Sequence, residues 1–352
     1  DLDAAFGLPG GTLGFDGEFL QIPESRRDYP DDGGQYGFSL VGITQGSNAL
    51  KVGFHYVRYH SRLPLIDGLT GSQAAIDGTS QSEVDRIAAG LTPIYIGEGL
   101  SPEDAAASAE ETAGQLVLSS YANDAGYVAT YPEDIDMVGL TFSTATMRSG
   151  TLLSGEFSHH RDFPFQRNLG DVFGAILSPV QFDDAYKDNG IGVFGADERI
   201  RGYERLNRSQ LALSALQIFP SVLGASQAFV GLDGAWVHVH DYPGGNDVAL
   251  QGFKGGDENS WGYRVSGILQ YNGVFGGLNL SPSATFVHDV SGYTPAPISS
   301  FIEDRKAVIL GLNASYINRV EASLSWTNFF DAEPTNRLTD RDNIRFRISY
   351  GF

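Results

Sequence analysis

Two histidine-containing motifs hold the side chains with the most reactive chemistry. His60-Ser61 places a hydroxyl nucleophile next to a general base, which is the minimum that a serine hydrolase needs. No third group that would orient the histidine can be assigned, so a barrel hydrolase is the weakest of three hypotheses. His159-His160 could bind a metal, but neighbouring side chains of a strand point to opposite faces. We therefore predict no catalytic residue, no metal site and no cofactor at these motifs.

Acidic residues gather in the segments between apolar stretches and give the chain a formal net charge of −20. This charge argues against a nucleic-acid partner, because phosphates would be repelled over the whole surface. Each acidic cluster could bind calcium, or bridge to lipopolysaccharide through divalent cations. The clusters are Asp28 with Asp31 and Asp32, Asp183-Asp184, Asp257-Glu258 and Asp331-Ala-Glu333.

The end of the chain indicates which elements position these groups. Alternate residues of the last strand are apolar, and those between them include Arg345 and Arg347. A terminal strand with one apolar face is typical of a transmembrane β-barrel, and it resembles the C-terminal signal by which bacterial outer-membrane barrels are recognised for insertion. We therefore predict a location in the bacterial outer membrane. The predicted assembly signal consists of Phe346, Ile348, Tyr350 and Phe352.

The same alternation recurs along the chain and predicts an all-β fold. No apolar run reaches the roughly 18–20 residues of a membrane-spanning helix, so a membrane span would have to be a barrel. We predict an antiparallel transmembrane β-barrel over residues 1–352, with about 12 strands, or 14 or more if an N-terminal part is missing. The predicted strands are 50–56, 137–144, 210–215, 228–236, 263–272, 278–286, 308–316, 320–327 and 343–352, with weaker candidates at 12–21, 35–44 and 151–160.

The connections between these strands alternate between long and short. The short ones include Asn272-Gly273, which is a signal for a two-residue type I′ hairpin. Long outer loops and short periplasmic turns are the asymmetry expected of outer-membrane barrels. The predicted long connections, which we expect to face outward, are 61–133, 161–207, 241–260, 291–304 and 331–342.

The longest connection, residues 61–133, carries helical signals. Ser101-Pro102-Glu103-Asp104 supplies a cap residue, a proline at the first helical position and first-turn acids, before an alanine-rich run that ends near Leu118. A second short helix is predicted over 82–89. We expect a folded lid or plug, with a disordered acidic insert as the alternative. Tyr59, His60 and Arg62, at its first junction with a strand, are gate candidates.

The face of the strands predicted to point inward mixes charges of both signs with apolar side chains. Opposite charges on this face could pair across the lumen. A wide aqueous porin would have polar walls nearly throughout, so the apolar patches suggest a narrow interior that passes or holds something greasy. Packing against the long loop is the alternative. The lumen candidates are Arg264, Glu156, Asp233, Phe229, Phe275, Arg345 and Arg347.

Motifs along the chain from about Asp32 onward carry a family resemblance. They include Tyr59-His-Ser-Arg-Leu-Pro64, Ser260-Trp-Gly-Tyr-Arg264, Phe286-Val-His-Asp289 and Trp326-Thr-Asn-Phe-Phe330. These motifs resemble one family of long, uncharacterised proteobacterial outer-membrane proteins. The resemblance implies a barrel similar in character to long-chain fatty-acid channels, encoded beside a LolB-like lipoprotein and an RND-type transporter.

These expectations lead to two main functional hypotheses. The first is an outer-membrane channel or transfer protein for hydrophobic or lipid-like compounds, and not an enzyme. The second is a non-transporting scaffold of an envelope-spanning complex with a lipoprotein and a transporter. In both, the expected partners are outer-membrane lipid, lipopolysaccharide and the barrel-assembly machinery, with the lipoprotein and the RND-type transporter as further candidates.

Overall fold

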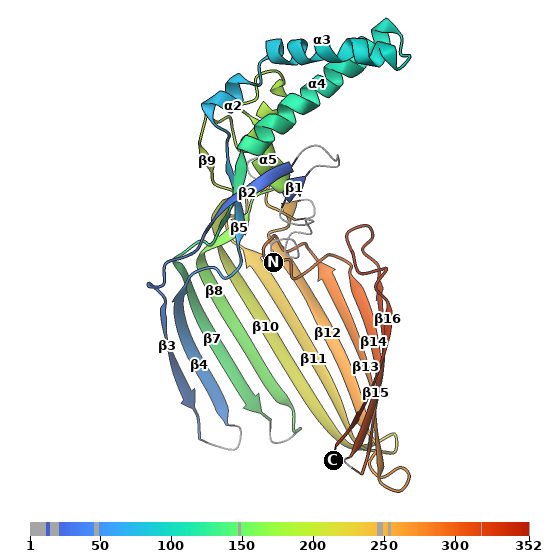
Figure 1. The fold of residues 1–352 in the computed structure, drawn as a ribbon. Coiled ribbons are helices and arrows are strands. Elements are labelled where there is room, and N and C mark those ends of the chain that lie inside the picture. The colour runs from blue at the N-terminus through green and yellow to red at the C-terminus, as the bar shows by residue number, and fades with distance from the viewer. Residues whose placement is uncertain are drawn as a thin grey trace.

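One large antiparallel sheet dominates the computed structural model, which describes residues 12–14, 21–45, 49–146, 149–244, 249–252, 255–317 and 319–351 (Figure 1). The sheet has 11 strands, and its spatial order follows the order of the chain. Its strands are β3 (Tyr36–Ile43), β4 (Leu50–Tyr59), β7 (Ile135–Ala145), β8 (Leu152–Gln166), β10 (Tyr203–Val222), β11 (Ala225–Val239), β12 (Asn259–Gln270), β13 (Leu278–Ser291), β14 (Lys306–Tyr316), β15 (Val320–Phe330) and β16 (Asn343–Tyr350).

The curved sheet ends at β3 on one edge and at β16 on the other (Figure 1). Among the described residues, each of these strands pairs with a single neighbour, so the pairings do not close the sheet into a barrel. The prediction was about 12 strands in one sheet, and the described residues place 11 in it. Residues 12–14 form a short strand that belongs to a second sheet, because they pair with residues 21–23.

The strand register places side chains of one kind in continuous rows across the sheet. Leu324 of β15 lies opposite Phe346 of β16 and Leu312 of β14. The next residue, Ser323, lies opposite Arg347 and Asn313. The predicted alternation is therefore confirmed, since successive residues turn to opposite faces. We call the face with Leu324 the apolar face and the face with Ser323 the polar face.

The connections alternate in length as predicted, with the short ones together at one end of the strands (Figure 1). The two-residue hairpin predicted at Asn272-Gly273 is wrong, because residues 271–277 separate β12 from β13. Tyr271 pairs with Leu280 across this wider turn, and Gly276 and Gly277 both adopt positive φ. Phe275 lies in the turn and is 76% exposed, so its predicted place on the inward face is also wrong.

The head, which we define as residues 12–14, 21–28, 65–130 and 169–200, lies beyond the other end of the strands (Figure 1). It is built on a five-stranded sheet with the order β1-β2-β6-β5-β9. Its helices pack on this sheet around a core that includes Ile66, Tyr121 and Ile176. The elements are β1 (Thr12–Gly14), β2 (Gln21–Asp28), β5 (Leu65–Leu69), β6 (Gly126–Thr130), β9 (Arg199–Ile200), α2 (Gln73–Asp77), α3 (Gln81–Gly97), α4 (Pro102–Asp124), α5 (Leu169–Leu177) and the 3₁₀ helix η1 (Asp184–Lys187).

Both predicted helices are present, and both are longer than predicted. The Ser101 hydroxyl accepts a hydrogen bond from Asp104 N at 3.2 Å, which is the predicted cap of α4. Ala105, Ala109 and Ala113 are fully buried, and α3 and α4 pack side by side. The folded insertion is therefore favoured over the disordered one. No helix in the described ranges is long and apolar enough to cross a membrane.

Candidate functional site

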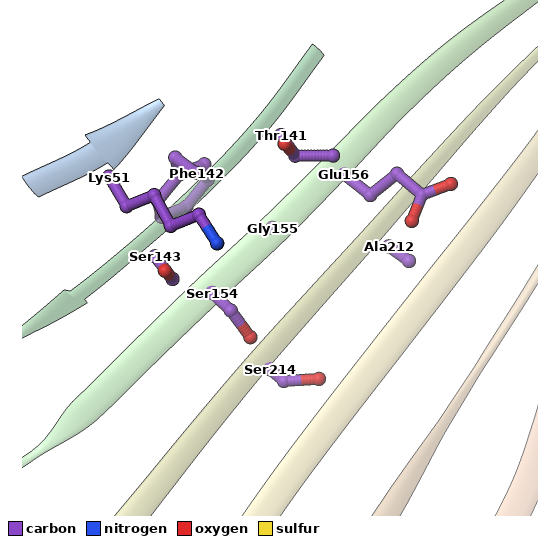
Figure 2. Close-up of a pocket in the computed structure, with 9 residues that line it drawn as sticks. All are labelled: Lys51, Thr141, Phe142, Ser143, Ser154, Gly155, Glu156, Ala212 and Ser214. Carbon is purple, nitrogen blue, oxygen red and sulfur yellow. The ribbon is translucent and has the colours of Figure 1, made fainter. Parts of the chain in front are cut away.

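A shallow hollow on the polar face forms the centre of the candidate site (Figure 2). Lys51, Ser143, Ser154 and Ser214 lie in one row across four neighbouring strands, because each is the register partner of the next. Glu156 lies two residues farther along β8 and therefore points to the same face. The hollow has a volume of about 320 Å³ and is lined mostly by hydroxyl and charged groups.

The same row continues into an ion pair. The sequence had predicted that opposite charges on this face could pair, without naming the partners. Asp233 is the register partner of both Ser214 and Arg264. Its Oδ2 atom lies 2.9 Å from Arg264 Nη2, and its Oδ1 accepts a hydrogen bond from the Ser214 hydroxyl at 2.7 Å. The Arg264 side chain is 57% exposed, so this pair faces solvent and contributes little stability. A second hollow of about 270 Å³ adjoins the pair.

The other predicted lumen residues occupy different parts of the polar face. Arg347 lines a separate hollow of about 390 Å³ together with Glu321. Arg345 lies on the same face of β16 and is exposed. Phe229 lies between Ile218 and Ile268 in a row that is apolar, nearer the short turns. The polar face therefore carries charged rows and an apolar patch, but it does not bring all the predicted residues into one site.

The gate candidates do not form a catalytic pair. His60 is buried: its Nδ1 lies 3.1 Å from the backbone N–H of Asp134, which donates to it, and its Nε2 lies 2.7 Å from Gly33 O. The Ser61 hydroxyl donates to Leu63 O at 2.7 Å instead of to the imidazole. The geometry therefore does not support the hydrolase hypothesis. Arg62 is exposed.

The third gate candidate, Tyr59, belongs to a cluster that the sequence did not reveal. Its hydroxyl lies 2.9 Å from His160 Nδ1, and His160 Nε2 lies 3.0 Å from Nη2 of Arg208. The Arg208 guanidinium lies over the Phe163 ring, 4.5 Å from its centroid. His159 points to the opposite face, where it lies 3.0 Å from the Ser209 hydroxyl, so the predicted divergence of the two histidines is confirmed.

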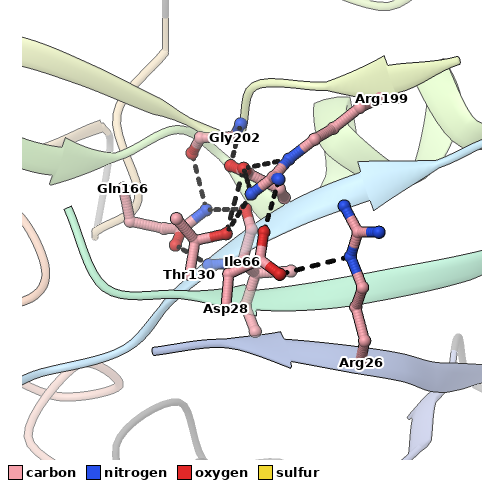
Figure 3. A network of polar contacts seen from close by, with 8 residues as sticks. Arg26, Asp28, Ile66, Thr130, Gln166, Arg199 and Gly202 are labelled. Carbon is pink, nitrogen blue, oxygen red and sulfur yellow. Dashed lines mark hydrogen bonds and ion pairs between the residues drawn. The ribbon is translucent and has the colours of Figure 1, made fainter. Parts of the chain in front are cut away.

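An ion pair with a buried carboxylate joins strands within the head (Figure 3). Asp67 on β5 has a side chain that is only 3% exposed, and its Oδ2 lies 2.8 Å from Nη2 of Arg199 on β9. Arg199 also donates to Thr130 on β6 at 2.7 Å and pairs with Asp28 on β2. One guanidinium thus links four of the head's five strands.

A second set of contacts fastens the head to the large sheet (Figure 3). Gln166, the fully buried last residue of β8, accepts a hydrogen bond from Ile66 N at 2.7 Å and donates to Ile66 O at 3.0 Å. It also donates to Gly202 O at 2.7 Å, while Gly202 N donates to Asp67 Oδ1 at 2.8 Å. A Cβ at position 202 would lie 1.8 Å from Ile66 O, so only glycine fits there. The head and the sheet are therefore joined by direct, buried contacts.

Local contacts hold titratable groups in the head and where the head joins the large sheet. Burial raises the pKa of the Tyr121 hydroxyl to about 12. This hydroxyl donates to Ile176 O at 2.9 Å and accepts from Gly71 N at 3.1 Å. A hydrogen bond from Arg58 holds the pKa of Asp134 below its usual value. These groups have structural roles.

The acidic clusters bind groups of the protein itself. Asp331 lies 2.8 Å from Lys306 Nζ, Asp257 accepts a hydrogen bond from Tyr293 N at 2.8 Å, and Asp183 caps η1. Within the described ranges, no group of three or more histidine, aspartate or glutamate residues is arranged to hold a metal ion. The expectation of loop-bound calcium gains no support from this arrangement.

The predicted assembly signal lies on the apolar face of edge strand β16. Phe346, Ile348 and Tyr350 are 66%, 64% and 58% exposed. Phe352 lies outside the described residues.

Comparison with known families gives one match. The model of a family described as "Protein of unknown function (DUF1302)" matches residues 6–352. A comparison with curated proteins finds no match.

Proposed function

The chain belongs to the DUF1302 family, and from this premise we propose that it is an outer-membrane β-barrel channel or transfer protein for hydrophobic or lipid-like compounds. One observation carries the proposal: large apolar side chains are exposed along one whole face of the sheet. Leu40, Leu140, Leu232, Leu310 and Phe346 are each between 44% and 72% exposed. Soluble proteins rarely expose so extended an apolar surface, whereas membrane-spanning strands do, because the side chains on that face contact the lipid hydrocarbon.

The lengths of the strands fit this proposal. A membrane-spanning strand needs about 9–11 residues, and β7, β12, β14 and β15 have 11 or 12. With 11 strands in antiparallel order, β3 and β16 run in the same direction, so pairing them directly would be parallel. An antiparallel closure of the proposed barrel therefore requires an odd number of further strands between them.

The polar face supports a path for amphipathic compounds. The row from Lys51 to Arg264 offers charges and hydroxyls, and the patch around Phe229 offers apolar surface. A compound with a polar group and a hydrocarbon part would find partners for both on this one face. The head lies at one end of this path, where we propose that it acts as a gate.

Uptake by proteoliposomes tests the proposed function. Vesicles with the full chain are expected to take up a fluorescently labelled lipid faster than protein-free vesicles. The Asp233→Arg variant, which places two positive charges on neighbouring strands, is expected to slow uptake by about tenfold, equivalent to about 1.4 kcal/mol. Asp340→Arg, a charge reversal at a side chain that is 85% exposed and lies outside the head and the hollows, is the matched control and should leave the rate unchanged. Absence of uptake by correctly assembled wild-type protein would contradict the proposal.

The scaffold remains the second candidate because of the helical hairpin α3–α4. Ile94, Ile96 and Leu116 on this hairpin are 55%, 44% and 49% exposed. Apolar side chains in such positions can contact a partner protein. Stable co-purification of the chain with a lipoprotein or transporter, together with no uptake, would favour this candidate.

A further inference from the structure

A buried arginine without a counter-ion lies where the head meets the polar face. Arg208 is 7% exposed, and its register partners are His160 and the buried Val239. Among the described residues, no carboxylate oxygen lies within 4.0 Å of its guanidinium. The other buried charges behave differently, since Asp67 pairs with Arg199 and Asp289 with Arg305.

The Arg208 cluster, which we define as Tyr59, His160, Phe163 and Arg208, contains hydrogen-bond donors that lack an acceptor. Arg208 Nε is buried and has no hydrogen-bond partner in the described part of the chain. Since a guanidinium can only donate, Nε2 of His160 must accept from Arg208 Nη2. His160 then carries its proton on Nδ1 and donates to the Tyr59 oxygen. The hydroxyl hydrogen of Tyr59 therefore points away from the histidine.

The cluster is therefore positively charged and rich in donors. It has no negative charge of its own, and the Phe163 ring covers the guanidinium on one side. Buried charges in proteins are normally paired, and buried donors are normally satisfied. An oxyanion would meet both requirements, because carboxylate and phosphate oxygens accept hydrogen bonds from guanidinium and hydroxyl groups.

We propose that the Arg208 cluster binds the oxyanionic headgroup, a carboxylate or a phosphate, of an amphipathic compound that moves along the polar face. This inference rests on the proposed function and names the chemistry of its ligand. Phe163 and the nearby core of Phe165, Val239 and Leu250 supply the apolar surroundings expected beside such a headgroup.

Equilibrium binding to the full chain in lipid nanodiscs tests the site, with radiolabelled dodecanoate and dodecanol as a matched pair of probes. Wild-type protein is expected to bind dodecanoate about tenfold more tightly, because hydrogen bonds to a charged group are the strong ones. Arg208→Gln should remove this preference and leave dodecanol binding unchanged. Tyr59→Phe should also reduce the preference for dodecanoate over dodecanol, but by a smaller factor. Arg161→Gln, an exposed arginine beside the cluster in sequence, is the control and should have no effect.

The outcomes separate this inference from the proposed function. Equal binding of the two probes to wild-type protein would overturn the oxyanion site alone, whereas no binding of either probe would contradict the proposed function. If Arg208→Gln does not assemble, an unchanged preference in Tyr59→Phe overturns the site. Dodecyl phosphate is expected to compete with dodecanoate. Acetate or inorganic phosphate competing equally well would overturn the assignment to an amphipathic compound.

Discussion

Replacing Asp67 with asparagine is expected to loosen the head by about 2 kcal/mol. This is less than the roughly 3–5 kcal/mol for breaking a fully buried ion pair, because the Arg199 side chain is 37% exposed although that of Asp67 is only 3% exposed. The substitution preserves the shape of the side chain but removes the charge that faces Arg199 at 2.8 Å. Arg199 would keep its ion pair with Asp28 and its hydrogen bond to Thr130. Thr130 and Gly202 would each lose a carboxylate as hydrogen-bond acceptor. Amide hydrogen exchange measures the effect, and faster exchange is expected in the head while the large sheet stays protected.

Asp184→Asn is the matched control for this prediction. Asp184 pairs with Lys187 at the surface of the same head, and its side chain is 83% exposed. A surface ion pair of this kind contributes about 0–1 kcal/mol, so the exchange pattern should hardly change. Wild-type protection of the head in the Asp67→Asn variant would contradict the joining role given to the buried pair.

Replacing Phe346 with arginine is expected to impair assembly of the protein in a membrane. Phe346 lies on the apolar face of β16 and is 66% exposed. A charge on the lipid face near the midplane of a bilayer costs about 2–4 kcal/mol, a large share of a typical net stability of about 5–15 kcal/mol. The folded fraction after insertion into vesicles, separated from the unfolded fraction by its mobility in unheated gels, measures the loss.

The neighbouring residue provides the control. Arg345 lies on the polar face of the same strand, so Arg345→Gln should assemble almost as well as the wild type. Normal assembly of Phe346→Arg, combined with failure of Arg345→Gln, would mean that the two faces have been assigned the wrong way round.

The strands of the large sheet were predictable because each has two different faces. In β15, Glu321, Ser323 and Ser325 alternate with Ala322, Leu324 and Trp326, and the register keeps these faces continuous across the sheet. The same alternation places Asp233 and Arg264 on one face, where the sequence predicted only that opposite charges could pair. When each face of a strand meets a single environment, apolar and polar residues alternate along its sequence.

The head was only partly predictable, because apolar and polar residues do not alternate along its strands. β5 and β6 are buried almost throughout, so their sequences do not alternate. Helix α5 is mainly apolar, and periodicity cannot separate such a segment from a buried strand. Helix α4 could be predicted because its capping residue acts locally, through the hydrogen bond from Asp104 N to the Ser101 hydroxyl.

The Arg208 cluster could not be predicted because tertiary pairing creates it. The sequence placed residues 161–207 in a loop, whereas β8 continues to Gln166 and β10 begins at Tyr203. The register between these strands shifts between Leu206 and Arg208, and this irregularity interrupts the alternation. His160 and Arg208 are therefore neighbours only in the folded sheet.

We propose above all that the apolar face of the sheet meets lipid while the polar face meets water. Nitroxide labels placed one at a time at residues 321–326 of β15 test this claim directly, because the chain has no cysteine that would react elsewhere. In vesicles, labels at Ala322, Leu324 and Trp326 should be more accessible to oxygen, which dissolves in lipid. Labels at Glu321, Ser323 and Ser325 should be more accessible to a water-soluble nickel complex. Equal accessibility along the strand, or the opposite alternation, would contradict the claim.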